Sequence, residues 1–228
     1  MRLVHEDLEL PLLFQENKVN VLVVEHKAYF SRMIMDLKEQ MEGGLGPFVL
    51  SKNNKILHLA KTAELIIDVF ALDINSRKAI SKLYEVLEQE AVKEENYLDS
   101  LALRTKIMAF VEQILQDQEL PVVFDQDFGW NSIFKAMNIR FEEECESLVE
   151  GIVNYLEICS GALGIKLFVF VNLKSFLSRE DLLALYKQLA YKKIFVLLLE
   201  NSVGEKLPEE EILLLDEDLC EIIIGRDV

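Results

Sequence analysis

The sequence predicts an α/β fold in which a discontinuous head is interrupted by an inserted all-helical leg. Residues 167–171 and 194–199 are continuous apolar runs of strand length, which is typical of strands buried on both faces. Ser178 and Asp181 form an S-x-x-D box that opens a helix between these two runs. A strand, a helix and a strand in this order predict two parallel strands joined by a right-handed crossover.

The amino-terminal part of the head supplies further expected strands. Residues 2–14 alternate in part and contain Pro11, which predicts two short strands of a small antiparallel layer. Residues 19–25 form the next buried strand, and residues 26–40 follow as a helix because their apolar positions keep helical spacing. A glycine-rich segment at 43–46 ends that helix.

Two further segments of the head precede the helical part. Residues 48–51 and 56–59 predict a hairpin that turns at Asn53 and Asn54. Residues 63–70 fit either a strand or a helix.

After residue 73 the pattern is helical throughout. Four successive segments keep helical periodicity, at residues 76–92, 97–118, 130–137 and 141–160. An all-helical insert between two α/β halves predicts a head at residues 1–72 and 162–228 and a helical leg at residues 73–161. In the returning half, we expect the acidic residues at 209–211 and 216–218 to coat a surface loop before a last strand at 220–224.

The composition is that of a folded, acidic protein. With 228 residues, 51% of them hydrophobic, the chain has enough apolar side chains for one large core or two small ones. No apolar run approaches the roughly 20 residues that span a bilayer, and the amino terminus lacks the apolar region of a signal peptide. Cys145 and Cys159 lie on the apolar stripe of one expected helix, which favours buried thiols over ligands or nucleophiles. We therefore expect a cytoplasmic protein without a membrane partner.

The sequence lacks the motifs of common catalytic and nucleotide-binding sites. The glycine-rich segment follows a helix and lacks the Lys-Ser/Thr pair with which a P-loop holds phosphate and magnesium. His5, His26 and His58 have no serine or cysteine neighbour in a sharp turn, so we interpret them as surface or edge histidines. We expect no catalytic residues and no ATP site.

An acidic segment of the leg is the candidate metal site. The candidate ligands are Asp117, Glu119, Asp125, Asp127 and Glu142. Calcium prefers roughly six to eight oxygen ligands on a bendable loop. Ala136 stands where an EF-hand that begins at Asp125 would place its glutamate, so the segment is not an EF-hand. From the residues alone, a calcium site and a solvated acidic turn both stay open.

Several blocks of the sequence resemble a known family. They are FVFVNLKSFLSREDL in the carboxy-terminal half, LDEDLCEII near the end, AELIIDVFALDINS, and the strand VLVVE. Together, in the same order and over nearly the whole chain, they resemble the Csn-two family of CRISPR-associated proteins, the adaptation accessory of type II-A systems.

The resemblance implies a head with the fold of a degenerate P-loop ATPase, without nucleotide motifs, and a helical leg. It implies a ring-shaped homotetramer that needs calcium and threads double-stranded DNA ends through a lysine-lined hole. It also implies a role in spacer acquisition for antiviral defence, alongside the integrase complex and the effector nuclease, with no enzymatic activity.

The charge of the chain limits how it can bind DNA. A formal net charge of −16 argues against broad attraction to nucleic acid. We expect a few basic residues, repeated by symmetry around one axis, to contact phosphates rather than bases. The candidate DNA-binding residues are Lys52, Lys55, Lys135 and Arg140. Taken singly, these residues also fit solvated surface positions, and a metal-dependent nuclease, a nucleotide-binding P-loop-like protein and a ligand-free scaffold are the alternative functions.

Overall fold

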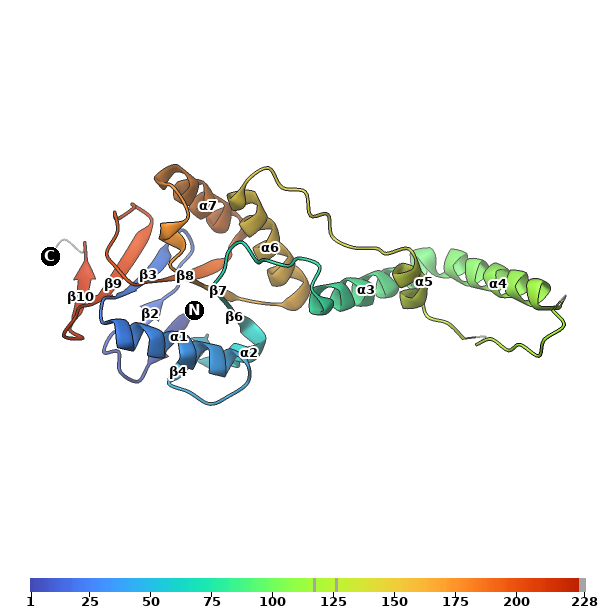
Figure 1. Cartoon of the computed structure of the whole chain (residues 1–228), viewed down its shortest axis with the longest axis horizontal. Helices are drawn as coiled ribbons and strands as arrows, with labels where there is room; N and C mark the ends of the chain where they lie inside the picture. The colour runs from blue at the N-terminus through green and yellow to red at the C-terminus, as the bar shows by residue number, and fades with distance from the viewer. Residues whose placement is uncertain (117, 126, 226–228) are drawn as a thin grey trace. The chain divides into compact units, whose positions relative to one another are not determined.

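A computed structural model of the chain describes residues 1–116, 118–125 and 127–225 (Figure 1). Over these residues the chain has a mixed α/β fold with two β-sheets. It divides into two compact units, one made of Met1–Ile74 with Glu143–Val228 and the other of Asn75–Glu142. We call them the sheet unit and the helical unit.

The sheet unit is built on a six-stranded sheet with the strand order β10-β9-β3-β8-β7-β6. The strands are β3 (Val19–Val24), β6 (Ala63–Ile66), β7 (Leu167–Val171), β8 (Phe195–Glu200), β9 (Glu210–Leu215) and β10 (Glu221–Ile224). Neighbouring strands are parallel except for β10, which runs antiparallel to β9. Every residue of β3 and β7 is buried, as their continuous apolar runs predicted.

The predicted crossover is confirmed. Strands β7 and β8 are parallel neighbours, and the short 3-10 helix η1 (Leu173–Ser175) and the helix α7 (Arg179–Lys192) connect them. The hydroxyl of Ser178 accepts the N–H of Asp181, and the Asp181 carboxylate accepts the N–H of Ser178. The capping box therefore sets the start of α7, as the sequence indicated.

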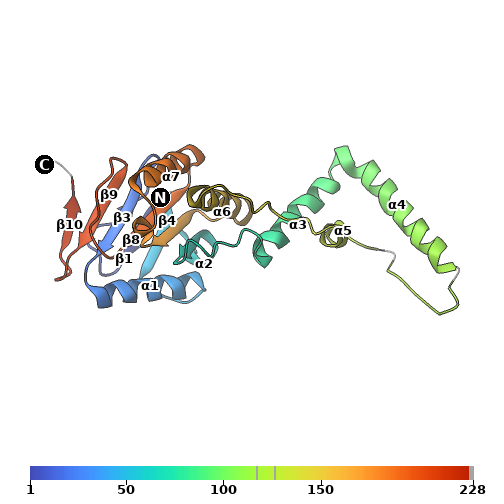
Figure 2. The same ribbon diagram turned by 45° about the horizontal axis from the view of Figure 1, so that its top comes forward.

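Helices cover both faces of the large sheet (Figure 1, Figure 2). The helices α6 (Leu148–Leu163) and α7 pack on one face, in a core that contains Ile152 and Phe168. The helix α1 (Lys27–Met41) packs on the other face, in a core that contains Val169. Because consecutive strand residues point to opposite faces, both faces of β7 need apolar side chains. The continuous apolar run supplies them.

A small antiparallel sheet completes the sheet unit, with the order β2-β1-β4-β5. Its strands are β1 (Arg2–His5), β2 (Leu12–Leu13), β4 (Phe48–Lys52) and β5 (Lys55–Leu57). The predicted hairpin is confirmed, since Asn53 and Asn54 have φ angles of 51° and 59°, the positive pair that a type I′ turn requires. The ambiguous segment that follows splits into the one-turn helix α2 (Leu59–Thr62) and the strand β6.

The described part of the helical unit contains three helices. They are α3 (Arg77–Ala91), α4 (Glu94–Gln116) and α5 (Trp130–Ala136). The hydroxyl of Tyr84 on α3 donates to the carbonyl of Ile139 at 3.0 Å, and Trp130 stacks on Phe134 within α5. The ring of Tyr84 also packs against the ring of Phe134, which gives α3 and α5 a shared apolar contact. In α4, Ser100 is the one buried residue among those described.

Two predicted boundaries differ from the structure. The helix expected at 141–160 begins only at Leu148, because the Ser147 hydroxyl accepts the N–H of Glu150 at 3.2 Å and caps it there. Cys145 therefore lies outside the helix and is exposed, whereas Cys159 is buried as expected. Because α6 packs on the large sheet, residues 143–161 group with the sheet unit and not with a leg at 73–161.

No helix among residues 1–116, 118–125 and 127–225 is both long enough and apolar enough to cross a membrane.

Candidate functional site

The tip of the β4–β5 hairpin presents two lysines side by side. Lys52 and Lys55 flank the turn and lie directly opposite each other in the strand register, so their side chains leave the same face of the sheet. Both are exposed, and within the described residues neither forms an ion pair. Like charges directly opposite each other destabilise a hairpin. A bound phosphate group would relieve that repulsion.

The other two basic candidates lie on one short segment of the helical unit. Lys135 is in the last turn of α5, and Arg140 follows a turn at Asn138, whose φ angle is 52°. Both side chains are exposed. The hydrogen bond from Tyr84 to the Ile139 carbonyl fixes the backbone between them to α3. The backbone between the two candidates is therefore anchored to α3.

The candidate calcium ligands that the structure describes do not form a cluster. Asp117 lies outside the described residues. The exposed candidates are Glu119, Asp125, Asp127 and Glu142. Asp127 forms an ion pair with Arg104 at 2.6 Å, and the guanidinium of Arg104 lies over the ring of Phe128. Of the side chains that the structure describes, no three His, Cys, Asp or Glu are placed to hold one metal ion.

A buried polar cluster in the sheet unit was not predicted. Glu210 opens β9 and its side chain is fully buried, so the expectation that residues 209–211 coat a surface loop is wrong. The ammonium group of Lys174 donates to both carboxylate oxygens of Glu210, at 2.9 and 3.0 Å, and to the carbonyl of Glu205 at 2.7 Å. The hydroxyl of Tyr186 donates to the same carboxylate at 2.7 Å. Lys174 and Tyr186 are distant from Glu210 along the chain, so no local sequence pattern indicated the cluster.

Glu200, at the end of β8, is a second buried carboxylate of this cluster. It is 4% exposed and accepts the backbone N–H of Lys174 at 3.1 Å. Burial raises the pKa of Glu200 to about 7, and the hydrogen bond from the Lys174 backbone and the charge of Lys174 offset the burial only in part. Burial and the Glu210 charge also raise the pKa of the Tyr186 hydroxyl, which keeps its proton and donates.

The cluster connects segments of the sheet unit, and one pattern in the sequence could have indicated the strand that carries Glu210. Lys174 ties the segment at 201–209, which crosses from β8 to β9, to the body of the sheet unit. The apolar run at 212–215 has the length and composition of a buried strand, and it could have revealed β9.

The interpretation of the histidines as surface or edge residues is wrong for His5. It is 4% exposed and lies in β1, between β2 and β4. Its Nδ1 accepts the N–H of Asp7 at 3.1 Å, and its ring packs against Phe48. Burial lowers the pKa of His5, so the ring is neutral at pH 7. His26 caps α1 through its ring nitrogen, and His58 is exposed.

The link between β3 and α1 bears on nucleotide binding. A P-loop places a glycine-rich loop between a strand and a helix. Here Glu25 and His26 alone separate β3 from α1, and the glycine-rich segment at 43–46 comes after α1. At the end of β7, the Asn172 side chain is used internally, since it accepts the N–H of Asn201 at 3.1 Å. The ends of β3 and β7 therefore lack the loop that cradles phosphates.

A family comparison agrees with the sequence blocks. The model of the family described as CRISPR-associated protein (Cas_Csn2) matches residues 40–219, well over half of the 228-residue chain. The matched region includes both basic pairs, the acidic segment and the buried cluster around Lys174. The chain therefore belongs to the Cas_Csn2 family of CRISPR-associated proteins, which are proteins of CRISPR adaptation.

Proposed function

We propose that this protein is a non-enzymatic, sequence-independent binding protein for the ends of double-stranded DNA, and that it acts in spacer acquisition. In this proposal four copies form a ring-shaped homotetramer that calcium stabilises. The observation that carries the DNA-binding part is the opposed pair Lys52 and Lys55 in a member of the Cas_Csn2 family.

The chemistry of the two basic pairs favours the DNA backbone. Ammonium and guanidinium groups on exposed turns contact phosphate oxygens, which carry no sequence information. Since the chain has a net charge of −16, one protomer alone repels a duplex at long range. A ring repeats Lys52, Lys55, Lys135 and Arg140 by symmetry, and it concentrates positive charge at one axis.

The helix α4 supports self-association. Its large apolar side chains are open to solvent in the single chain, with Leu98 75%, Phe110 62% and Leu101 50% exposed. Monomeric proteins rarely expose extended apolar surface of this kind. We take a second copy of the chain as its partner, because closed homo-oligomers bury self-complementary surfaces.

Calcium is the metal that the acidic segment of the helical unit would accept. Separate carboxylates repel one another, and a hard divalent cation with oxygen ligands draws them together. The proposed ligands are Asp117, Glu119, Asp125, Asp127 and Glu142. Binding would release Asp127 from its ion pair with Arg104. We expect chelation, or Asp125→Asn with Asp127→Asn, to lower the mass measured by light scattering, and an unchanged mass would contradict a calcium-stabilised ring.

The proposal treats the sheet unit as a degenerate P-loop-ATPase-like head and the helical unit as its inserted leg. A mainly parallel sheet with helices on both faces supports this, and so does a β3–α1 link too short for a phosphate loop. A two-metal nuclease needs grouped carboxylates, whereas Glu200 at the end of β8 is buried in the cluster with Lys174. We place the protein in the cytoplasm, with the integrase complex and the effector nuclease as partners.

A salt titration tests the DNA-binding part. Binding of a linear duplex, followed by fluorescence anisotropy in calcium, should weaken steeply with salt and show no cleavage products. Lys52→Ala with Lys55→Ala should lower the affinity by roughly tenfold and flatten the salt dependence, because each phosphate contact contributes to the slope. Lys27→Ala with Lys38→Ala, which removes two exposed lysines of α1, is the matched control. Equal effects of the two double variants would reject the hairpin as a DNA contact.

A further inference from the structure

A groove is lined by an edge strand of the small sheet, β2, and by the two outer strands of the large sheet, β9 and β10. Its volume of about 400 Å³ falls in the range of ligand sites, roughly 300–1,000 Å³. Its apolar lining includes Leu10, Leu12, Leu13, Leu213, Ile223 and Ile224. The DNA and calcium contacts proposed above do not use this groove.

The backbone of β2 has an open hydrogen-bonding position at the groove. The N–H of Phe14 donates to the carbonyl of Met1 at 2.8 Å, so the backbone of Phe14 is turned toward β1. Because bonded and non-bonded residues alternate in an antiparallel pair, the N–H and the carbonyl of Leu13 point away from β1. The Leu13 carbonyl accepts the side-chain amide of Asn20 at 3.1 Å, whereas its N–H has no acceptor within the described residues. An extended peptide along β2 would supply one.

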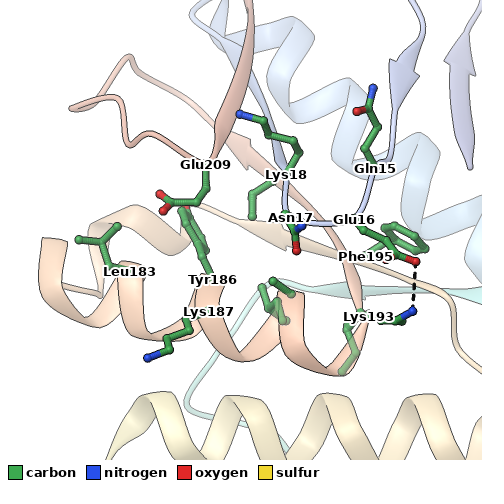
Figure 3. A pocket seen from close by; sticks show the side chains of 14 residues that line it. Gln15, Glu16, Asn17, Lys18, Leu183, Tyr186, Lys187, Lys193, Phe195 and Glu209 are labelled. Atoms are coloured by element: carbon green, nitrogen blue, oxygen red, sulfur yellow. Dashed lines mark ion pairs between the residues drawn. The ribbon is translucent and has the colours of Figure 1, made fainter.

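Two lysines also line the groove, Lys18 and Lys206. Both ammonium groups donate to backbone carbonyls, and in the part of the chain that the structure describes neither forms an ion pair. Figure 3 draws the neighbouring cavity beside α7, and there the side chain of Lys18 points away from Lys187 of that helix. The groove therefore combines apolar walls with two uncompensated positive charges.

The helical unit contains a segment with matching chemistry at residues 120–124, with the sequence LPVVF. Leu120 is 73% exposed and Val123 is 96% exposed. Within the described residues this segment forms no backbone hydrogen bond. Its two valines favour an extended strand, and Pro121 is accepted in an edge strand, where the missing N–H faces solvent. The segment thus has the properties of a strand without a sheet.

The flanks of the segment are acidic, with Glu119 before it and Asp125 after it. The proposed calcium ligands are five carboxylates, so one calcium ion leaves this region negative. Acidic flanks match Lys18 and Lys206, and the apolar residues between the flanks match the apolar lining of the groove. Charge and polarity are therefore complementary between the segment and the groove.

We propose that residues 120–124 of one copy of the chain add as an extended strand to β2 of a second copy, and that their apolar side chains fill its groove. In a dimer with twofold symmetry this contact occurs twice, since the segment of each copy lies in the groove of the other. The inference rests on the proposed homotetramer and deepens it. The α4 contact then joins two such dimers into the ring.

Light scattering of the full-length protein in calcium tests the contact. Ile223→Glu places an unpaired charge in the groove and should shift the mass from that of a tetramer toward that of two 26.3 kDa chains. Ile222→Glu is the matched control and should keep the tetramer. Ile222 is 45% exposed and Ile223 is 41% exposed, but Ile222 lies on the opposite face of β10 and does not line the groove.

The segment has its own pair of variants. Val123→Glu should lower the mass as Ile223→Glu does, because the charge would have to enter the apolar groove. Leu45→Glu, at a position of the sheet unit that is 95% exposed, is the matched control and should leave the mass unchanged.

A mixture of Ile223→Glu and Val123→Glu separates docking between copies from docking within one chain. A mixed dimer keeps one intact contact of the two, so the mixture should have a higher mass than either variant alone. Docking within one chain predicts no gain on mixing, and that result would reject the exchange between copies.

A labelled peptide of residues 118–125 tests the groove directly. It should bind the full-length Val123→Glu variant, whose own segment is disabled, in a fluorescence anisotropy titration. It should bind the double variant with Ile223→Glu roughly tenfold more weakly, because a buried unpaired charge opposes association.

The outcomes separate this inference from the proposed function. If the wild type is a tetramer and either Ile223→Glu or Val123→Glu keeps its mass, the groove contact is rejected while the ring stands. Equal dissociation by Ile222→Glu and Ile223→Glu would reject it as well. If the wild type in calcium is not a tetramer, the proposed ring fails, and the peptide titration still decides whether the groove binds the segment.

Discussion

The sheet unit and the helical unit bury their apolar residues to different degrees. In the sheet unit, Phe168, Val169 and Phe170 of β7 are each 0% exposed. In the helical unit, Leu98 and Phe110 of α4 are 75% and 62% exposed. The sheet unit has its core complete within the chain, and the helical unit has apolar surface that a partner would cover.

This difference suggests that the sheet unit determines the stability of the chain and that α4 determines its association. A parallel sheet packed on both faces supplies most of the free energy of folding of its unit. A helix with little buried surface contributes little on its own and is available for association. Substitutions in the sheet unit should therefore change unfolding, and substitutions on α4 should change the oligomeric state.

The largest effect should come from the centre of the sheet. We expect Phe168→Ala to lower the free energy of unfolding by about 3–5 kcal/mol, because it leaves a cavity between β7 and the helices above it. Phe110→Ala on α4 is the matched control and, with both variants measured in excess chelator so that the proposed assembly does not contribute, should change it by less than about 0.5 kcal/mol. Urea unfolding followed by circular dichroism measures both. Similar losses would mean that the two units do not differ in packing.

The buried ion pair gives the next effect. Lys174→Met should lower the free energy of unfolding by about 3 kcal/mol, since Glu210, whose side chain is 0% exposed, loses its cation. Glu210→Gln in the same chain should restore much of the loss, because the uncompensated buried charge is removed. Absence of this rescue would show that Lys174 stabilises the crossover by packing alone.

The pH dependence of stability should reflect Glu200. Its folded-state pKa of about 7 lies above the ordinary value of 4.5, so the folded chain binds the proton more tightly than the unfolded chain does. The contribution of Glu200 to the free energy of unfolding is therefore fully present below pH 4.5. It declines as the pH rises from 4.5 to 7 and does not change further above pH 7. Glu200→Gln should gain up to about 3 kcal/mol relative to the wild type across this window. Parallel stability curves for the two proteins between pH 4.5 and 7 would contradict the assignment.

The smallest effect on stability and the clearest effect on mass should come from α4. Measured in excess chelator, so that the proposed assembly does not contribute, Leu98→Ser with Phe110→Ser should leave the unfolding free energy within about 0.5 kcal/mol. The same variant should shift the mass in light scattering toward that of the 26.3 kDa chain. A variant that keeps the wild-type mass would remove α4 from the interface.

The sequence predicted the parts of the fold that depend on neighbouring residues. The capping box at Ser178, the hairpin turn at Asn53 and the buried run of β7 were all predictable because local spacing determines them. Strand β9 was missed because the acidic residues at its start favoured a surface loop over the apolar run at 212–215. The burial of Glu210 depends on Lys174, 36 residues away, which no local pattern indicates.

The candidate sites also differ in whether neighbouring residues or distant residues determine them. Lys52 and Lys55 flank the hairpin turn, as the sequence predicted, whereas the strand register that places them opposite each other is a finding of the structure. The groove along β2 joins residues that are distant along the chain, so no local pattern indicated it. The acidic candidates between α4 and α5 are close in sequence, but closeness in sequence does not fix where exposed carboxylates point.

Competition between linear and covalently closed circular DNA tests the central claim most directly. The measurement is a gel shift of a labelled linear duplex by the wild-type protein in calcium, with unlabelled linear or closed circular DNA of equal length as competitor. A ring that binds DNA ends predicts that linear DNA competes effectively and that closed circular DNA competes poorly, with no cleavage of either. Equal competition by the two forms would contradict end binding, and the basic pairs would then be ordinary solvated surface residues.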